Sequence, residues 1–409
     1  MHILEIPSFF PPLGGAFCLD QAKALKERGH EVRILSCNQY GITKGISRFL
    51  KLRVARWVES HDEIVVIREN MHALPKMTHV NQQRWCGRVM SMYQQYRQEY
   101  GKPDVLHAHC CQWAGVAARM ISETEGIPYF ITEHISKGPF EVGYGKNWTR
   151  HKWARTLLKE TYEKAACVIP VSEELVDELE CFFGKKYKWR SVSNVIDVDF
   201  FEYREREGIS GRSGSRCSEE SSALKVSEER PFKFCCLAVA DGESLYWKGY
   251  DVLAEAFSGM TGCELHIADR GISGIELHIA GRGTDRTELK KMFPTNTVFH
   301  GEVDKASVRE LLYSCDALVL ASRSEVQPLV LLEAMSTGIP VVSTECVPRS
   351  ERIEGACLIS KTGDSASLRA RMMEVMHISP SPLVSAKVKE LASPGKVAMQ
   401  LEQIFKEFV

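Results

Sequence analysis

The sequence lacks the features that would place it in a specialised class of protein. No stretch approaches the roughly 20 consecutive apolar residues that a membrane-spanning helix needs. Neither sign of charge dominates, because 52 Lys and Arg residues balance 53 Asp and Glu residues. This balance argues against a general nucleic-acid binder, which would show a strong basic excess. The first residues are typical of a strand and lack the basic start and apolar run of a signal peptide.

Cysteine and glycine motifs are also missing. The 14 cysteines include no C-x-x-C spacing, and the adjacent pairs at 110–111 and 235–236 lie inside apolar stretches. We therefore expect reduced thiols in a cytoplasmic protein and no zinc site. No G-x-G-x-x-G follows the first expected strand, which disfavours a nicotinamide dehydrogenase.

What remains is the composition of an ordinary globular protein, with 409 residues of which 44% are hydrophobic and 26% charged. At about 100–200 residues per domain, this length predicts two domains, or three at most. Short apolar runs alternate with helical patterns in both halves, which predicts βα units, parallel sheets and covering helices. Strands are expected at 3–6, 31–35, 64–67, 105–108, 129–132 and 167–171, and then at 232–238, 276–280, 297–300, 317–321 and 340–343.

The two halves are separated by residues 204–230, which are rich in Ser, Gly, Glu and Arg and poor in large apolar residues. This composition predicts a linker or mobile excursion. Ligands of such folds bind beyond the carboxyl ends of strands, so a cleft between two lobes is the expected site. A short repeat lies in the second half, where 264–271 recurs as 276–283. We expect the second copy to hold the core strand, because Gly281 and Gly283 supply the turn that follows it, and the first copy to be a loop or edge strand.

The most informative segment is 321–342, which predicts a strand end, a loop, a helix and a new strand. Pro328 suits the start of the helix. The N–H groups of Leu329 and Val330 would form an anion site suited to phosphate. Glu325 falls in the loop and Glu333 inside the helix. Carboxylates beside a phosphate site are compatible with it when they address neutral hydroxyls, such as those of a sugar and a ribose.

This segment resembles the E-x7-E signature of the retaining glycosyltransferases of family 4, also called group 1. The resemblance implies an α/β fold of the GT-B type, with two Rossmann-like β/α/β lobes facing across a cleft. The implied domains are an amino-terminal acceptor-binding lobe at 1–203 with a crossing helix at 386–409, the linker or mobile excursion at 204–230, and a nucleotide-sugar-binding lobe at 231–385. Val326 and Gln327 depart from the usual Gly-Phe pair after the first glutamate.

Further matches fall in the first half. Gly14 and Gly15 resemble the family's amino-terminal glycine loop, which approaches the donor diphosphate. Pro103–His109 resembles a "PDvvHaH" strand end, and 132–134 a "TeH" strand end. Alternation sends His107 and His109 to the same side of the strand, and the resemblance points to His109 as the one that addresses sugar or acceptor. A metal site at His107, His109 and His134 stays open as an alternative, although the family needs no bound metal for catalysis.

In the second half, residues 247–251 resemble the "KG.d" motif, which makes Lys248 a diphosphate ligand. The family commonly places an arginine shortly before this lysine, whereas this chain has Asp241 and Glu243 there. Either Arg282 supplies the second positive charge or donor binding is weakened. This departure is the main reason to consider a degenerate enzyme.

Two basic-aromatic segments concern the acceptor side. Residues 143–159 contain five Lys or Arg and no acid, with Trp148 and Trp153 among them, and 185–190 is similar. They suit an anionic membrane surface or a lipid-diphosphate acceptor, or form solvated helices with a buried apolar face. We expect a cytoplasmic protein with peripheral contact at the inner membrane face.

The resemblance implies a metal-independent, hexosyltransferase-type enzyme. It would move a sugar from a nucleotide-diphosphate donor, UDP- or GDP-linked, to a hydroxyl of a glycan or lipid-linked acceptor in surface polysaccharide synthesis. No cofactor is implied beyond the donor itself. Lys248 would stabilise the leaving diphosphate, Glu325 would orient the donor sugar, and Glu333 the ribose. The alternatives are a nucleotide-sugar epimerase of related fold and a non-catalytic glycosyltransferase partner subunit.

Overall fold

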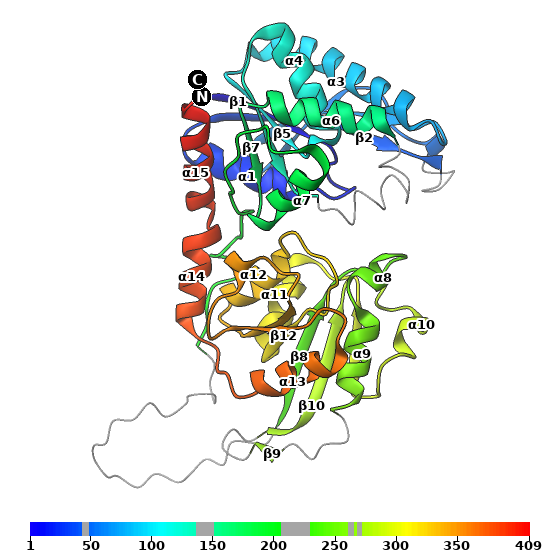
Figure 1. The fold of residues 1–409 in the computed structure, drawn as a ribbon, viewed down its shortest axis with the longest axis vertical. Coiled ribbons are helices and arrows are strands. Elements are labelled where there is room, and N and C mark those ends of the chain that lie inside the picture. The colour runs from blue at the N-terminus through cyan, green and yellow to red at the C-terminus, as the bar shows by residue number, and fades with distance from the viewer. Residues whose placement is uncertain (43–48, 136–150, 206–229, 261–265, 268–271) are drawn as a thin grey trace, which may run out of the picture. The chain divides into compact units, whose positions relative to one another are not determined.

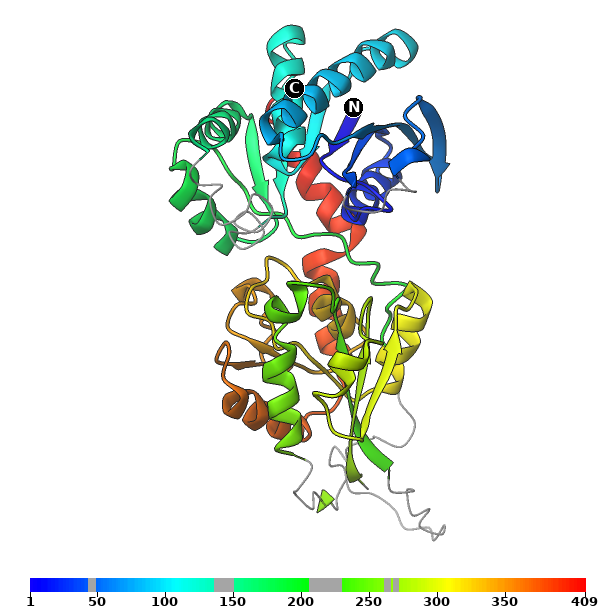
Figure 2. The same ribbon diagram turned by 90° about the vertical axis from the view of Figure 1, so that its right-hand side faces the viewer.

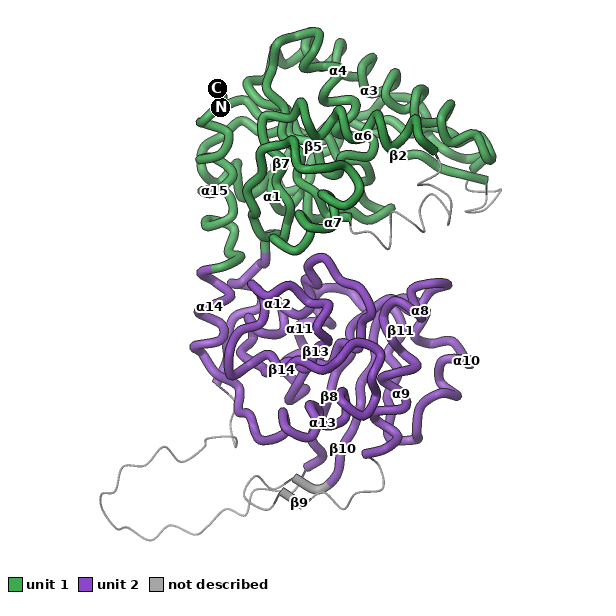
Figure 3. Tube along the Cα trace, in the orientation of Figure 1, with its two compact units in different colours: residues 1–195, 391–409 green, residues 196–390 purple. Residues whose placement is uncertain are grey.

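The computed structural model describes residues 1–42, 49–135, 151–205, 230–260, 266–267 and 272–409. The chain forms two compact units, shown in Figure 3. The first comprises Met1–Val195 and Leu391–Val409, and the second comprises Ile196–Glu390. Residues 206–229 of the expected linker and residues 143–150 of the first basic-aromatic segment lie outside the described residues.

The first unit is built on a seven-stranded sheet in the order β3-β4-β2-β1-β5-β6-β7 (Figure 1). All neighbouring strands run parallel except β3, which pairs antiparallel with β4 at the edge. The elements of this unit are β1 (His2–Pro7), α1 (Ala16–Glu27), β2 (Glu31–Tyr40), β3 (Trp57–His61), β4 (Ile64–His72), α3 (Thr78–Tyr100), β5 (Val105–His109), η2 (Cys111–Gly115), α4 (Val116–Glu125), β6 (Tyr129–Glu133), α6 (Lys152–Lys164), β7 (Cys167–Pro170), α7 (Glu174–Phe183) and α15 (Pro394–Lys406).

Both faces of this sheet are covered by helices, as the near-continuous apolar strands require. On one face, α1 and the carboxy-terminal α15 share a core with the strands, in which Leu25, Leu401 and Phe405 are fully buried. On the other face, the Trp85 indole of α3 donates a hydrogen bond to the Cys37 carbonyl of β2 at 2.7 Å. The last helix of the chain thus completes the core of the first unit.

The second unit has a parallel sheet in the order β11-β10-β8-β12-β13-β14, with the short β9 paired antiparallel to β10. Its core packs α9 and α13 against the strands. The elements are β8 (Arg230–Leu237), α8 (Ser244–Trp247), α9 (Tyr250–Ser258), β9 (His266–Ile267), β10 (Ile272–Ala280), α10 (Thr287–Lys290), β11 (Thr297–Gly301), α11 (Lys305–Ser314), β12 (Ala317–Val319), α12 (Leu329–Ser336), β13 (Val341–Thr344), η5 (Arg349–Glu351), β14 (Cys357–Ser360), α13 (Ser365–Val375) and α14 (Pro382–Ala392).

Of the two copies of the short repeat, the second, at 276–283, supplies a central strand of the second sheet. β10 contains 276–280 and lies between β8 and β11. Of the first copy only β9 is described, and it pairs at the start of β10. The prediction that the second copy holds the core strand is therefore confirmed.

The unit boundaries differ from those expected. Residues 196–203 belong with the second unit, although we expected them in the first lobe, and 386–390 do so as well. The reason is visible in the packing. Gly338 has a φ of +86°, and a Cβ there would lie 2.5 Å from the Tyr203 ring. The Tyr313 hydroxyl donates to the Glu202 carbonyl at 2.8 Å.

Among the helices of the described residues, none is long and apolar enough to cross a membrane.

Candidate functional site

In the second unit, the candidate residues follow the carboxyl ends of β8, β10 and β12. Lys248 sits between α8 and α9, next to Gly249, whose φ is +65°. A Cβ at Gly249 would lie 2.0 Å from the Ala321 carbonyl oxygen, so only glycine allows this approach. The Arg323 N–H donates to the Trp247 carbonyl at 2.7 Å. These two contacts hold the α8–α9 turn against the chain that leaves β12.

The result is a direct ion pair between two of the expected site residues. Lys248 Nζ lies 2.6 Å from Glu325 Oε1, and the Ser322 hydroxyl donates to the same oxygen at 2.6 Å. The Glu325 side chain is only 9% exposed, while that of Lys248 is 30% exposed. The lysine therefore remains reachable by a ligand, and the carboxylate is fixed behind it.

The helix that follows provides backbone donors near this pair. α12 begins after Pro328, and no side chain caps its first turn. Leu329 and Val330 are its first residues and are partly buried, and Glu333 lies in its second turn, also partly buried. The amino terminus of a helix attracts anions because its first N–H groups have no partner within the helix. Glu325 and this helix terminus thus lie along one short stretch of chain, and the ion pair brings Lys248 to it.

Arg282, which we expected to supply the second positive charge, is paired with a neighbouring carboxylate. Arg282 lies in the turn after β10, where Gly281 approaches the Ala238 carbonyl so closely that a Cβ would lie 2.2 Å from its oxygen. The Arg282 side chain is 60% exposed, and its Nε donates to Asp241 at 2.5 Å. Arg286 donates to the same carboxylate at 2.9 Å. Asp241, which precedes Lys248 in the place of the family's arginine, therefore neutralises part of the local positive charge.

Sequence reasoning missed the role of Arg323. Its guanidinium donates to both carboxylate oxygens of Asp251, at 2.6 and 2.7 Å, and lies 4.4 Å from the centre of the Tyr246 ring. This pairing raises the pKa of Arg323 and lowers that of Asp251. Because Tyr246 and Asp251 flank Lys248, Arg323 fixes the turn that presents the lysine.

In the first unit, the glycine loop and the histidines meet at the carboxyl ends of β1, β5 and β6. Gly14 and Gly15 have φ values of +96° and +80°. A Cβ at Gly15 would lie 2.2 Å from the Phe9 carbonyl oxygen. The next helix, α1, carries Phe17 in its first turn, and the Phe17 ring stacks on His134 at 3.6 Å between ring centres.

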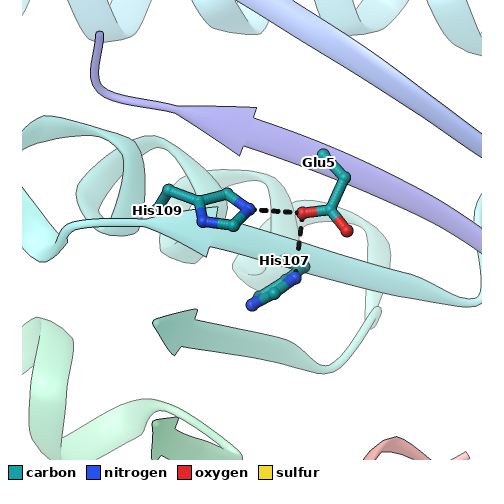
Figure 4. A group of neighbouring side chains, drawn as sticks. All are labelled: Glu5, His107 and His109. Carbon is teal, nitrogen blue, oxygen red and sulfur yellow. Dashed lines mark hydrogen bonds and ion pairs between the residues drawn. The ribbon is translucent and has the colours of Figure 1, made fainter. Parts of the chain in front are cut away.

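Beneath this stack lies a buried cluster of one carboxylate and two imidazoles (Figure 4). Glu5 Oε2 lies 2.8 Å from His107 Nδ1 and 2.7 Å from His109 Nε2. His107 and His109 thus face the same side of β5, as the alternation predicted. The His109 Nδ1 atom lies 3.3 Å from His134 Nε2. Both ring nitrogens of His109 are therefore engaged, and its side chain is 1% exposed.

The pKa values of Glu5, His109 and His134 in this cluster are shifted from their ordinary values. Burial opposes ionisation of Glu5, but the two histidines outweigh it and hold the pKa of Glu5 at about 2. Burial, and then His107, lower the pKa of His109. Burial, and then His109 and His107, hold the pKa of His134 well below its ordinary 6.5. The carboxylate is thus the stable charge, and neutral His109 and His134 are favoured around it.

The cluster also tests the metal alternative. The sequence left open a metal site at His107, His109 and His134, whereas the group whose ligand atoms lie within 4.8 Å of one another is Glu5, His107 and His109. Two ligands on one tetrahedral zinc ion lie about 3.3 Å apart, since each sits about 2.0–2.1 Å from the metal. The observed separations of 2.7 and 2.8 Å are shorter than that, and the 2.7 Å contact between His109 Nε2 and Glu5 Oε2 is a hydrogen bond. The geometry fits shared protons better than a shared metal ion.

Glu5 is the second residue that sequence reasoning missed. The sequence places it only in the first strand, yet its side chain is fully buried on β1, the strand that pairs with β2 and β5. A signal was available, because a glutamate inside an apolar strand of a parallel sheet is almost never buried without a partner.

Sequence comparisons now identify the family. A family described as "Glycosyltransferase Family 4" matches residues 14–200, and one described as "Glycosyl transferases group 1" matches residues 234–377. The chain belongs to glycosyltransferase family 4. The stretches matched contain all the site residues that we expected in the glycine loop, the histidine strand ends, the lysine turn and the two-glutamate segment.

Individual relatives of this family 4 chain include two bacterial proteins. TuaC of Bacillus subtilis, named as a teichuronic acid biosynthesis glycosyltransferase, is 25% identical over 84% of this chain and 81% of its own length. WcaC of Escherichia coli, named as a colanic acid biosynthesis glycosyl transferase, is 29% identical over 28% of each chain.

Solved structures agree on the GT-B fold of family 4. Sucrose-phosphate synthase from Thermosynechococcus elongatus has a TM-score of 0.72 at 15% identity and covers 100% of this chain and 99% of its own. HepE from Anabaena, solved in complex with UDP-glucose, has a TM-score of 0.65 at 16% identity, with both chains covered completely.

A separate hollow of about 360 Å³ lies in the first unit of this glycosyltransferase, between α3, α4 and α6. The Trp153 ring forms part of its wall. It lies tilted against His79 at 4.2 Å and stacks with Trp113 at 5.9 Å between ring centres. Arg119, which pairs with Glu160 at 3.0 Å, adds a cationic group. Aromatic walls with a few polar groups are typical of ligand sites.

Proposed function

We propose that this glycosyltransferase transfers a hexosyl group from a nucleotide-diphosphate sugar to a hydroxyl of a glycan or lipid-linked acceptor, with retention of anomeric configuration. The names of TuaC and WcaC support a role in the synthesis of surface polysaccharide. The structure of HepE with UDP-glucose supports a nucleotide-sugar donor. UDP- or GDP-sugars are the donors we propose.

One observation carries the donor proposal, namely the Lys248–Glu325 pair at 2.6 Å beside the amino terminus of α12. In the proposed reaction, the bond between the sugar and the diphosphate breaks as the acceptor oxygen attacks from the same face. The departing diphosphate takes the acceptor's proton. Lys248 and the amides of Leu329 and Val330 stabilise its negative charge, and the glycine loop at Gly14 and Gly15 gives it further backbone contacts.

The two glutamates are proposed to address neutral hydroxyls. Glu325, held by Lys248 and Ser322, orients the donor sugar, and Glu333 holds the ribose. We do not assign nucleophile and acid roles to them, although retaining glycosidases use such a pair. Arg282 is proposed as a minor donor contact, because Asp241 already pairs with it.

In the first unit, we propose that His109 addresses the sugar or acceptor and that Glu5 positions its ring. Since the Nε2 proton of His109 is directed at Glu5, its Nδ1 is the atom that faces outward, toward His134. Contact with a substrate therefore requires that a substrate hydroxyl replace His134 at this nitrogen. The hollow beside Trp153 is proposed as an acceptor site.

The decisive experiment is a donor screen with the purified chain. A panel of nucleotide sugars is tested by thermal shift, followed by assays of released nucleotide with and without acceptor. Donor binding that is greatly weakened in Glu333→Ala, with the fold intact, supports the proposed site, and unchanged donor affinity refutes that role. Turnover that persists in EDTA supports metal independence, and loss of turnover in EDTA that added metal restores contradicts it.

The same screen separates the other candidate functions. Asp241, which pairs with both Arg282 and Arg286, favours a non-catalytic partner subunit as the second candidate. Such a subunit would bind nucleotide poorly and show no turnover alone. An epimerase would consume donor without any acceptor.

A further inference from the structure

Exposed apolar side chains gather at one edge of the first unit. Leu50 is 75% exposed and Val58 is 51% exposed. Six large apolar residues of this kind fall within residues 42–77, and the other described residues of the first unit contribute only Trp189 and Val409. The six are Ile42, Leu50, Val54, Val58, Leu74 and Met77. This is a concentration rather than the normal scatter of single apolar residues on a surface.

These residues lie on two segments that are held together. The Phe49 ring lies 4.2 Å from the His72 ring, and His72 Nε2 lies 2.8 Å from the Phe49 carbonyl oxygen. The Asn70 amide donates to the Arg53 carbonyl at 2.8 Å. Residues 49–56 are thus fixed against the end of β4, whose chain continues directly into 74–77. We call residues 49–58 and 74–77 the β4 rim; it adjoins β3 and β4, the blue strands at the edge of the first sheet in Figure 2.

The β4 rim is basic as well as apolar. Residues 49–58 contain Lys51, Arg53 and Arg56 and no acidic residue, and 74–77 add Lys76. Arg56 pairs with Glu99, whereas Lys51, Arg53 and Lys76 are exposed beside the apolar side chains. Apolar side chains interleaved with cations fit a surface that is apolar below and anionic at its boundary, which is the make-up of an anionic lipid bilayer.

In the described parts of the basic-aromatic segments 143–159 and 185–190, several charges and rings are already engaged by neighbouring residues. Lys185 pairs with Glu180, Arg190 pairs with Glu407, and the Lys188 ammonium lies over the Phe408 ring at 5.1 Å. Trp153 forms the wall of a hollow, and Leu158 is fully buried. These charges and rings are engaged within the first unit. In the β4 rim, Arg56 pairs with Glu99 and the Arg53 guanidinium lies 4.8 Å from the centre of the Trp57 ring, whereas Lys51 and Lys76 are exposed.

We propose that the β4 rim docks on an anionic lipid bilayer. Leu50, Val54 and Met77 enter the headgroup region, where their apolar area leaves water. Lys51, Arg53 and Lys76 meet lipid phosphates, each cation adding to the attraction of the surface. The inference is independent of the donor chemistry proposed above, and it would bring the first unit close to any lipid-linked acceptor.

The test is co-sedimentation of the full chain with vesicles of phosphatidylcholine alone or with about 30% phosphatidylglycerol. We expect the protein to pellet with the anionic vesicles and to be partly released by added salt. Two double variants, Leu50→Ser with Val54→Ser and Lys51→Glu with Arg53→Glu, should each lower the bound fraction at least about fivefold. All altered side chains are exposed, so unchanged melting temperatures verify the fold.

Matched controls lie in the second unit. Leu383 is 73% exposed, and Lys290 and Lys291 are exposed on or next to α10. Leu383→Ser and the pair Lys290→Glu with Lys291→Glu should bind vesicles as the wild type does. The proposal is overturned if the wild type does not pellet, if it pellets equally with phosphatidylcholine alone, or if the rim variants bind unchanged. It is also overturned if ultracentrifugation shows a dimer that Leu50→Ser dissociates, because the rim would then be covered by a second copy.

Discussion

Lys248 and Glu325 lie 2.6 Å apart and form an ion pair, so the lysine that we propose as a diphosphate ligand already has a carboxylate partner. A donor must compete with Glu325 for the ammonium. The two side chains then have separable roles, one toward the diphosphate and one toward the sugar, and their variants should behave differently.

Replacement of the lysine removes the positive charge from the leaving group. We expect Lys248→Ala to lower kcat/KM at least about tenfold, which corresponds to about 1.4 kcal/mol of transition-state stabilisation. Steady-state kinetics with the donor found in the screen measure this. Lys291→Ala, an exposed lysine of the same unit, is the control and should leave kcat/KM unchanged. Wild-type kinetics in Lys248→Ala would exclude the lysine from the site.

Replacement of the carboxylate releases the lysine. We expect Glu325→Gln to bind the free nucleoside diphosphate as tightly as the wild type or more tightly, while turnover of the sugar donor falls. Isothermal titration calorimetry with the nucleoside diphosphate, beside turnover assays, separates the two effects. If Glu325→Gln loses affinity for the diphosphate itself, the carboxylate does not act on the sugar in the way proposed.

Glu5 should govern which nitrogen of His109 carries the proton. A glutamine at position 5 must donate as well as accept, so Glu5→Gln disturbs the contacts to His107 and His109 at 2.8 and 2.7 Å. We expect a changed His109 tautomer, measured by nitrogen-15 NMR of the imidazoles, together with a lower kcat and a smaller change in donor KM.

Glu133→Gln is the control for loss of a buried carboxylate. Glu133 is fully buried but is bonded to the Tyr162 hydroxyl at 2.7 Å and to backbone N–H groups. Its variant should leave the His109 tautomer unchanged. An unaltered His109 spectrum in Glu5→Gln would show that Glu5 is only a structural partner.

The histidine cluster predicts acid sensitivity. Burial, and then His109 and His107, hold the pKa of His134 well below 6.5. As the pH falls through about 6.5, His134 therefore binds a proton in the unfolded chain but stays neutral in the folded chain. The free energy of unfolding therefore falls as the pH drops below about 6.5. We expect the melting temperature of His134→Asn to depend less on pH between about 7.5 and 5.5 than that of the wild type. His377→Asn, at an exposed position, should keep the wild-type slope, and an equal slope in His134→Asn would contradict the assignment.

The lysine turn depends on its glycine. Gly249→Ala would combine a left-handed backbone, which costs about 1 kcal/mol for a residue with a Cβ, with a Cβ only 2.0 Å from the Ala321 carbonyl oxygen. Gly363 also has a positive φ, of +77°, but no atom lies within 4 Å of a Cβ built there. Thermal unfolding should therefore show a clearly lower melting temperature for Gly249→Ala than for Gly363→Ala. Equal melting temperatures would show that the turn can move away from Ala321.

The sequence predicted most strands and the order of the site segments, because buried parallel strands are continuous apolar runs bounded by turn residues. β3 escaped prediction since Trp57–His61 mixes apolar and polar residues, as an edge strand does. The lysine and the two glutamates were found through their spacing along the chain. Glu5, in contrast, contacts His109, which lies 104 positions away on a strand paired in parallel with β1, and no local sequence pattern reveals such a contact. The same holds for Arg323, whose partner Asp251 lies 72 positions away.

The placement of α15 has a consequence for synthesis of the chain. Its residues Leu401 and Phe405 complete the core of the first unit, yet the whole of Ile196–Glu390 is translated before them. At about 5–20 residues per second, the ribosome needs about 10 to 40 seconds for those intervening residues. During that time the apolar groove for α15 on the nascent first unit stays open to water and to chaperones. The unit whose strands are synthesised first is therefore the last to complete its core. A stop codon anywhere before residue 394 removes α15 and leaves that core incomplete.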